Sequence, residues 1–133
     1  MVDERPRDGL GRPLPREADP SQAVPGVPPR RQISDEEAWA AALAYLDNDM
    51  PFHAHEVFEM RWRQAPEPDR AAWQSLAQWG AALTHRARGN PVGARRVAAR
   101  AALVLAQAPH IPSCIDVDRV TSSCGQLMRD SSD

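Results

Sequence analysis

Lysine is absent from this 133-residue chain, and all sixteen basic residues are arginines. Cysteine is scarce as well: Cys114 and Cys124 are the only two, and their spacing matches no metal or redox motif. Two thiols are too few for a disulfide framework, so we expect both to stay reduced in a cytoplasmic protein. The formal net charge of −2 and the isoelectric point near 6.1 exclude a strong positive field over the whole molecule. Nucleic acid is therefore not an expected partner.

Long apolar runs are missing too. No run approaches the roughly 20 residues that are needed to cross a bilayer, so no membrane partner is expected. The N-terminus carries prolines and charges of both signs in place of the apolar centre of a secretory signal. Strand-like alternation and a glycine-rich phosphate loop are also absent from the sequence, which leaves helices as the predicted elements.

Residues 1–32 differ in composition from the rest of the chain. They contain seven of the thirteen prolines, six arginines and five acidic residues. Such a segment buries too little apolar surface to offset the entropy that ordering costs. The sequence therefore predicts a disordered, proline- and arginine-rich arm, followed by a single helical domain over residues 33–129 and a frayed tail over residues 130–133.

The domain is predicted to be all-α, a compact antiparallel bundle of about five helices. Capping residues, prolines and Gly89-Asn90 mark the ends of the helices. The predicted helices run from the cap at Ser34 to the turn at 47–49, from Pro51 to about Gln64, from a cap at Asp69 to about Arg88, from Pro91 to about Gln107, and from Asp116 to about Met128. The third helix is apolar nearly all round and is therefore expected at the centre, with Gly80 where a neighbouring helix approaches closely.

The stretch from Phe52 to Trp62 places ionisable groups on an apolar helix face. His55, Glu59 and Trp62 recur at i, i+4 and i+7, which is one side of a helix. Burying an ionisable group is costly unless it is paired, hydrogen-bonded or bound to a metal. This face therefore predicts either a site or an internal polar network. His53 is expected to be exposed on the far side, and Glu56 to point away from the stripe.

One hypothesis is a metal site with hydrolytic chemistry. Imidazole nitrogen and carboxylate oxygen at i, i+4 suit zinc, iron or manganese, so His55 and Glu59 are the candidate ligands, with His85 as the third. Gln74 and Gln78 would orient ligands or substrate, and Trp62 would wall the pocket. A bound metal would activate water or polarise an oxygen. The sequence identifies no catalytic residue.

The alternative hypothesis is a non-catalytic helical binding or scaffold module, in which the same residues form a structural hydrogen-bond network. On generic grounds this interpretation is favoured, because ion-pair networks occur at many non-functional positions. A zinc-protease motif is not favoured, since the second histidine of H-E-x-x-H is replaced by Glu59 and Glu56 lies off the stripe.

An arginine cluster surrounds the turn between the third and fourth predicted helices: Arg86, Arg88, Arg95, Arg96 and Arg100. Arginine matches phosphate oxygens in bidentate geometry, so this cluster is a candidate anion site. The favoured interpretation is simpler, because arginines at a helix end complement its dipole and keep the surface solvated. No interleaved aromatic residues indicate base stacking. The sequence allows a homo-oligomer without predicting one.

Three motifs together resemble a known family. They are His55-x-x-x-Glu59-x-x-Trp62, the glutamine-bearing segment from Trp73 to Gln78, and the run from Ala81 to Ala94 that contains Gly89-Asn90-Pro91-Val92-Gly93-Ala94. In order and spacing they resemble the bacterial and archaeal domain-of-unknown-function family 309, over roughly residues 35–108. The resemblance implies a small all-helical bundle and a metal-binding role for His55 and Glu59. It implies no particular reaction.

Overall fold

The fold is known from a computed structural model that describes residues 7–14 and 23–130. Within these residues it contains no strand, apart from an isolated bridge between Arg7 and Pro13. It contains five helices, which confirms the all-α prediction: α1 Asp35–Asp47, α2 Pro51–Gln64, α3 Glu67–Ala87, α4 Pro91–Gln107 and α5 Val117–Asp130. No helix of the described residues is long and apolar enough to span a membrane.

Local sequence signals explain most of the helix boundaries. Ser34 caps α1 in a complete capping box with Glu37, as its spacing predicts. Pro51 and Pro91 occupy the first turns of α2 and α4, where a missing N–H costs little. The predicted cap at Asp69 is wrong, because α3 already begins at Glu67. Pro68 fits inside its first turn for the same reason that Pro51 does.

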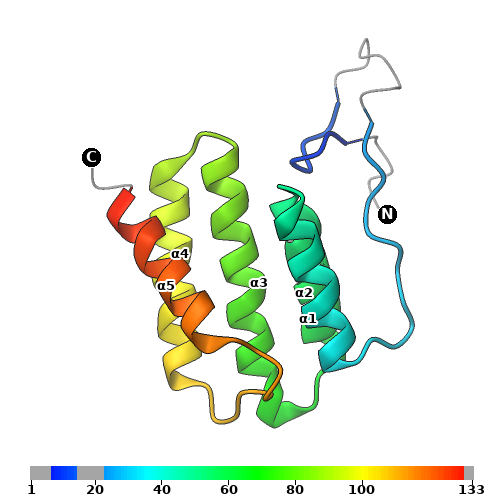
Figure 1. Ribbon diagram of the computed structural model, residues 1–133, viewed down its shortest axis with the longest axis vertical. Helices are drawn as coiled ribbons and strands as arrows, with labels where there is room; N and C mark the ends of the chain where they lie inside the picture. Colours follow the sequence, from blue (N-terminus) through cyan, green and yellow to red (C-terminus); the bar gives the residue numbers. More distant parts are fainter. Residues whose placement is uncertain (1–6, 15–22, 131–133) are drawn as a thin grey trace.

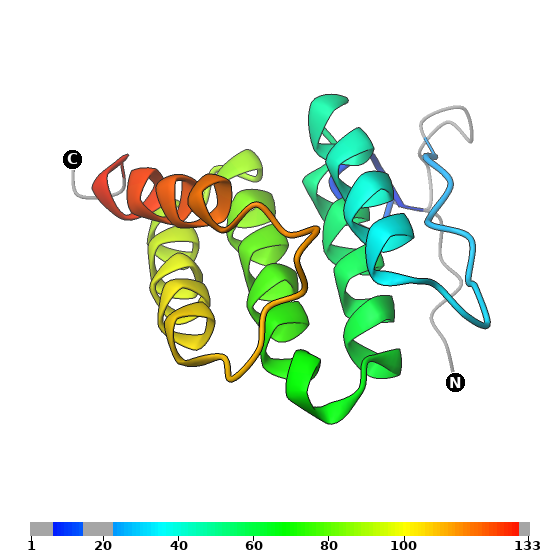
Figure 2. The same cartoon turned by 60° about the horizontal axis from the view of Figure 1, so that its bottom comes forward.

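The helices form two layers, with α2, α3 and α4 in one and α1 and α5 in the other. In Figure 1 α3 runs between α2 and α4, while α1 lies in front of α2 and α5 crosses in front of α4. Figure 2 shows the same order after rotation, with α1 and α5 on either side of α3. The central position of α3 follows from its apolar surface, since ten of its 21 residues are buried, from Ala72 to Thr84.

Aromatic side chains from three helices form the centre of the core. Trp79 of α3 has its ring centroid 6.5 Å from that of Trp39 of α1 and 6.0 Å from that of Phe58 of α2. Trp73 is completely buried, and its indole N–H donates to Asp35 Oδ1 at 3.0 Å. These contacts join α1, α2 and α3 on the side that also faces α5.

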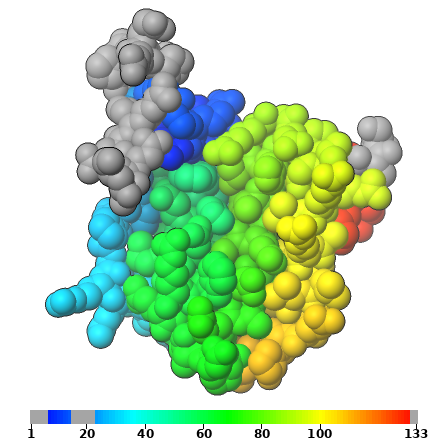
Figure 3. Space-filling view, turned by 180° about the vertical axis from the view of Figure 1, so that it is seen from behind, coloured from blue at the N-terminus to red at the C-terminus, as the bar shows by residue number. Residues whose placement is uncertain are grey.

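The arm contributes no helix in its described parts, residues 7–14 and 23–32, yet both parts contact the bundle. Figure 3 shows residues 7–14 packed against the upper end of the helices. The Arg88 guanidinium donates to the carbonyl oxygen of Leu10, at 2.6 and 3.1 Å, and His53 Nε2 lies 2.7 Å from the carbonyl oxygen of Pro25. The sequence did not predict these contacts. The rest of the predicted arm, and the tail after Asp130, lie outside the described residues.

Candidate functional site

The candidate site lies where α2 crosses α3, at Gly80 and His55. A Cβ atom added to Gly80 would lie 2.8 Å from the Cα atom of His55 and 2.9 Å from its Cβ atom. Real side chains do not approach that closely, so the absence of a side chain at position 80 allows the two backbones to meet. This confirms the role predicted for Gly80 and explains how the His55 ring reaches the backbone of α3.

Both ring nitrogens of His55 have partners. Nδ1 lies 2.8 Å from the carbonyl oxygen of Ala77 on α3, so Nδ1 carries the hydrogen and donates it. Nε2 lies 2.9 Å from Glu59 Oε2, and the other oxygen of Glu59 accepts from the guanidinium of Arg63. The side chains of His55 and Glu59 are 24% and 28% exposed. The predicted pair therefore exists at the edge of the core, within reach of solvent.

His85 belongs to a different hydrogen-bond system. Asn90 caps α4 by accepting from the backbone N–H of Gly93 at 3.0 Å, which turns its amide nitrogen toward His85 Nδ1 at 3.1 Å. Nδ1 therefore accepts, and the neutral ring carries its hydrogen on Nε2. His85 and His55 do line one small cavity of about 110 Å³, together with Phe52, Thr84 and Arg88.

Three protein ligands do not converge in the described part of the chain, where no group of three or more histidine, cysteine, aspartate or glutamate side chains could hold a metal ion. No hydrogen bond or ion pair joins the other predicted pocket residues, Trp62, Gln74 and Gln78, to His55 or Glu59. Trp62 is half-buried and packs against the core, and Gln74 is half-buried without a side-chain hydrogen bond to a described residue. The oxygen Oε1 of Gln78 is buried and has no hydrogen-bond partner among the described residues.

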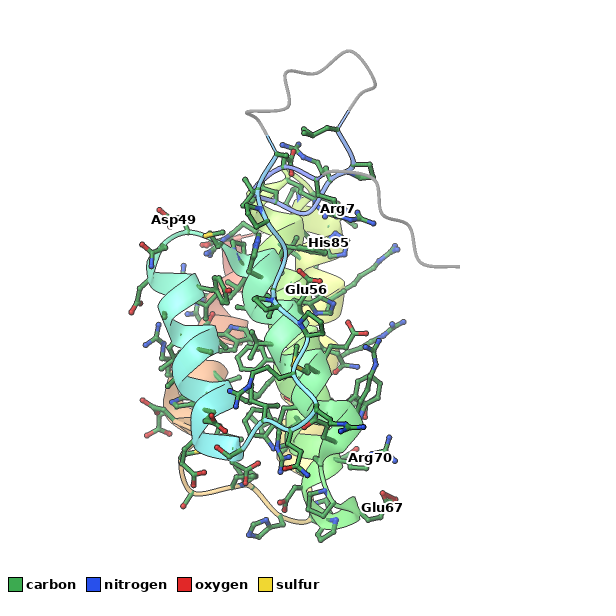
Figure 4. All side chains as sticks on the ribbon, turned by 90° about the vertical axis from the view of Figure 1, so that its right-hand side faces the viewer. Arg7, Asp49, Glu56, Glu67, Arg70 and His85 are labelled. Atoms are coloured by element: carbon green, nitrogen blue, oxygen red, sulfur yellow. The ribbon has the colours of Figure 1, made fainter. Side chains whose placement is uncertain are left out.

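One prediction about α2 is wrong, because His53, expected to be exposed, is 2% exposed. Glu56, predicted to point away from the face of His55 and Glu59, has a buried oxygen as well. The arm explains both, because it runs over this face of α2, as Figure 4 shows beside Glu56. Pro25 contacts His53, and a Cβ atom added to Gly26 would lie 3.8 Å from Glu56 Oε1. No signal local to α2 indicates that a distant segment covers it.

The arginines predicted as one cluster fall into two groups. Arg88 is engaged, because its guanidinium bonds to Leu10 and lies 5.7 Å above the centre of the Phe52 ring. The other four are exposed and form no side-chain hydrogen bond or ion pair with a described residue: Arg86, Arg95, Arg96 and Arg100. Arg88 is thus occupied by the arm, and an anion site on the four exposed arginines stays a prediction.

Comparisons with known proteins agree with the family resemblance. Residues 39–97 match the family described as domain of unknown function DUF309. The uncharacterized protein YpuF of Bacillus subtilis is 36% identical over 75 residues, which is 50% of this chain and 42% of that relative. The chain thus spans less than half the length of this relative, and no solved structure matches it. The resemblance to family DUF309 is therefore confirmed for the segment that carries His55, Glu59 and His85.

Proposed function

We propose that this chain is a non-catalytic helical binding module, in which His55 and Glu59 brace α2 against α3. The observation that carries the proposal is the engagement of both His55 ring nitrogens, one of them by a backbone carbonyl on the neighbouring helix. Because Nδ1 already donates to Ala77, the contact between Nε2 and Glu59 is a favourable hydrogen bond when Nε2 also carries a hydrogen. Arg63 then supplies a second positive partner to Glu59.

The surroundings of the pair support a structural role. The Gly80 contact fixes the His55 backbone against α3, so the imidazole loses little conformational entropy when it bonds to the Ala77 carbonyl. Removing the ring would leave that carbonyl without its side-chain donor and would open a gap at the helix crossing. The cavity beside His55, at about 110 Å³, is far smaller than the roughly 300 Å³ at which small-molecule sites begin.

The test compares two histidines that each contact a carboxylate. His55→Ala is expected to lower the free energy of unfolding by about 1–3 kcal/mol, measured by urea denaturation. His110→Ala is the matched control: its ring lies 2.6 Å from Asp69, but it is 59% exposed in a loop, and exposed pairs contribute roughly 0–1 kcal/mol. Equal, small losses in both variants would contradict the bracing role.

A metal-binding function is the second candidate, and one specific observation favours it. A histidine that ligates a metal commonly donates its other ring N–H to a backbone carbonyl, as His55 does to Ala77. That arrangement directs Nε2 toward the Glu59 carboxylate, and zinc, iron or manganese would accept both groups. Water or a second copy of the chain would supply the remaining ligands. His85 would join only if the Asn90 amide gave up its cap on α4.

Metal titration separates the two candidates. The bracing role predicts that zinc, ferrous iron and manganese give no saturable rise in melting temperature and no stoichiometric uptake by untagged protein. The metal role predicts a saturable rise that His55→Ala and Glu59→Gln each abolish. Uptake that survives both substitutions would mean that the metal binds elsewhere.

A further inference from the structure

A larger cleft lies between α1, α3 and α5, where Figures 1 and 2 show α1 and α5 on either side of α3. Its volume is about 280 Å³. Leu46, Pro51 and Leu83 give it apolar walls, and Trp79 lines it from the core, with only 2% of its surface exposed. The cleft thus combines an open mouth with an apolar interior, as small-molecule sites do.

A polar group from α5 completes the interior. The indole N–H of Trp79 donates to Ser123 Oγ at 2.7 Å, which joins α3 to α5 across the cleft. Ser123 accepts this bond, so its own hydroxyl hydrogen remains available as a donor. The bond also holds the Trp79 ring in one orientation, where it stacks on Trp39. A ligand would therefore meet a preformed surface.

The mouth of the cleft carries charges of both signs. Arg86 at the end of α3 and Asp49 in the turn between α1 and α2 both line it and are both exposed. Neither side chain forms a hydrogen bond or an ion pair with a described residue, and no ion pair joins one to the other. A third charge belongs to Arg119, whose Nη2 atom lies 3.8 Å from Asp47 Oδ1. Both side chains are exposed, so this ion pair is weak and Arg119 can exchange Asp47 for another partner.

We infer that this cleft binds a small zwitterion with an apolar body, namely an α-amino acid with an apolar side chain. Arg86 takes the carboxylate, Asp49 takes the ammonium group, and Leu46, Leu83 and Trp79 contact the side chain. The volume of about 280 Å³ lies just under the roughly 300 Å³ of drug-sized sites, which suits a ligand of this size. This inference deepens the proposed function, since it gives the binding module its ligand.

The charge pattern favours a zwitterion over a simple anion. Asp49 lines the mouth together with Arg86 and Arg119, so a carboxylate or phosphate without a positive charge of its own would leave Asp49 unpaired, whereas a zwitterion matches charges of both signs. Only one side of the cleft lies within the segment that matches the family. Asp49, Trp79 and Arg86 lie within the segment that matches the family, whereas the α5 wall lies beyond residue 97. The charged pair is thus part of the family segment, and Ser123 is supplied by the rest of this chain.

The experiment titrates the full-length protein with L-leucine and follows the tryptophan indole signals by nuclear magnetic resonance. Ser123→Ala identifies the Trp79 signal, because it removes the hydrogen-bond acceptor of that indole. L-Leucine amide lacks the carboxylate, and 4-methylpentanoate lacks the ammonium group. L-Leucine is expected to shift the Trp79 signal saturably, and each analogue to bind roughly ten-fold more weakly or worse, because each loses a charge-assisted hydrogen bond.

Substitutions at the mouth complete the test. Arg86→Gln and Asp49→Asn are each expected to weaken L-leucine binding roughly ten-fold, whereas Arg95→Gln on the exposed side of α4 leaves it unchanged. Asparagine tolerates the left-handed backbone of Asp49, whose φ is 57°, so that variant keeps the turn. Absence of saturation by about 10 mM L-leucine, a very weak affinity, would overturn the inference. So would tighter binding of 4-methylpentanoate. The His55 result concerns stability and stands apart from either outcome.

Discussion

Two histidines that line one small cavity, His55 and His85, present opposite ring chemistry. The Ala77 carbonyl fixes the hydrogen of His55 on Nδ1, whereas the amide of Asn90 makes Nδ1 of His85 an acceptor. The difference comes from the group that each ring meets: a backbone carbonyl in α3 for His55 and the side-chain amide of the residue that caps α4 for His85. A shared role for the two rings would therefore require the Asn90 cap to rearrange.

Cys124 gives a prediction at the same scale. It is completely buried, and burial raises the pKa of its thiol from the usual value near 9 to about 11. The folded chain thus holds a proton that the unfolded chain releases first. The stability contributed by this thiol is complete below pH 9 and is lost as the pH rises toward 11, by about 2 kcal/mol.

Urea denaturation at several pH values checks this loss. Cys124→Ala is expected to lack the dependence, so its stability should draw closer to that of the parent protein between pH 9 and 11. The half-buried Cys114 serves for comparison: burial, followed by the negative charges of Asp35 and Glu36, raises the pKa of its thiol too. Cys114→Ala keeps the Cys124 thiol, so this variant should still show most of the loss of stability between pH 9 and 11. Parallel curves for the parent and Cys124→Ala would contradict the assignment.

At the scale of elements, the crossing of α2 and α3 depends on one glycine. Alanine favours a helix over glycine by roughly 1 kcal/mol, so helix propensity alone would make Gly80→Ala stabilising. The added Cβ atom would however fall 2.8 Å from the His55 backbone, and backbone cannot move aside as a flexible side chain can. We therefore expect a net loss of about 1–3 kcal/mol in the free energy of unfolding, measured by urea denaturation.

Gly125→Ala is the matched control for this substitution. Position 125 also lies within a helix, α5, but the nearest atom to an added Cβ is the end of the Arg129 side chain at 3.2 Å, which can shift. This variant should be neutral or more stable by up to about 1 kcal/mol. If both glycine variants changed stability in the same direction, the close approach of α2 to α3 would not be the cause.

At the scale of the whole molecule, the arm covers polar side chains of α2. His53 Nε2 contacts the Pro25 carbonyl, while His53 Nδ1 and Glu56 Oε1 are buried without hydrogen-bond partners among the described residues. Arg88 holds another part of the arm at Leu10. The arm thus closes the surface of the bundle at two places that are separate in sequence.

Truncation tests the contribution of the arm. Removing residues 1–26 deletes the partner of His53 and should lower the free energy of unfolding by about 1–3 kcal/mol, with little loss of helical circular dichroism. Removing residues 1–14 keeps the contact between Pro25 and His53 and is expected to cost less. His53→Ala should add little to the longer truncation, because the contact is already gone. Full additivity would mean that the arm and His53 act independently.

The sequence by itself determined the local features of this protein. Caps and prolines set the helix boundaries, and periodicity identified α3 as central and placed His55 beside Glu59, because these properties depend on neighbours within one or two turns. Only the tertiary structure decided which residues meet across elements. The bond from His55 to Ala77, the separate partner of His85, the burial of His53 under the arm and the cleft beside Trp79 all join segments distant in sequence. Helical spacing cannot specify such contacts, because they depend on how whole helices and the arm pack together.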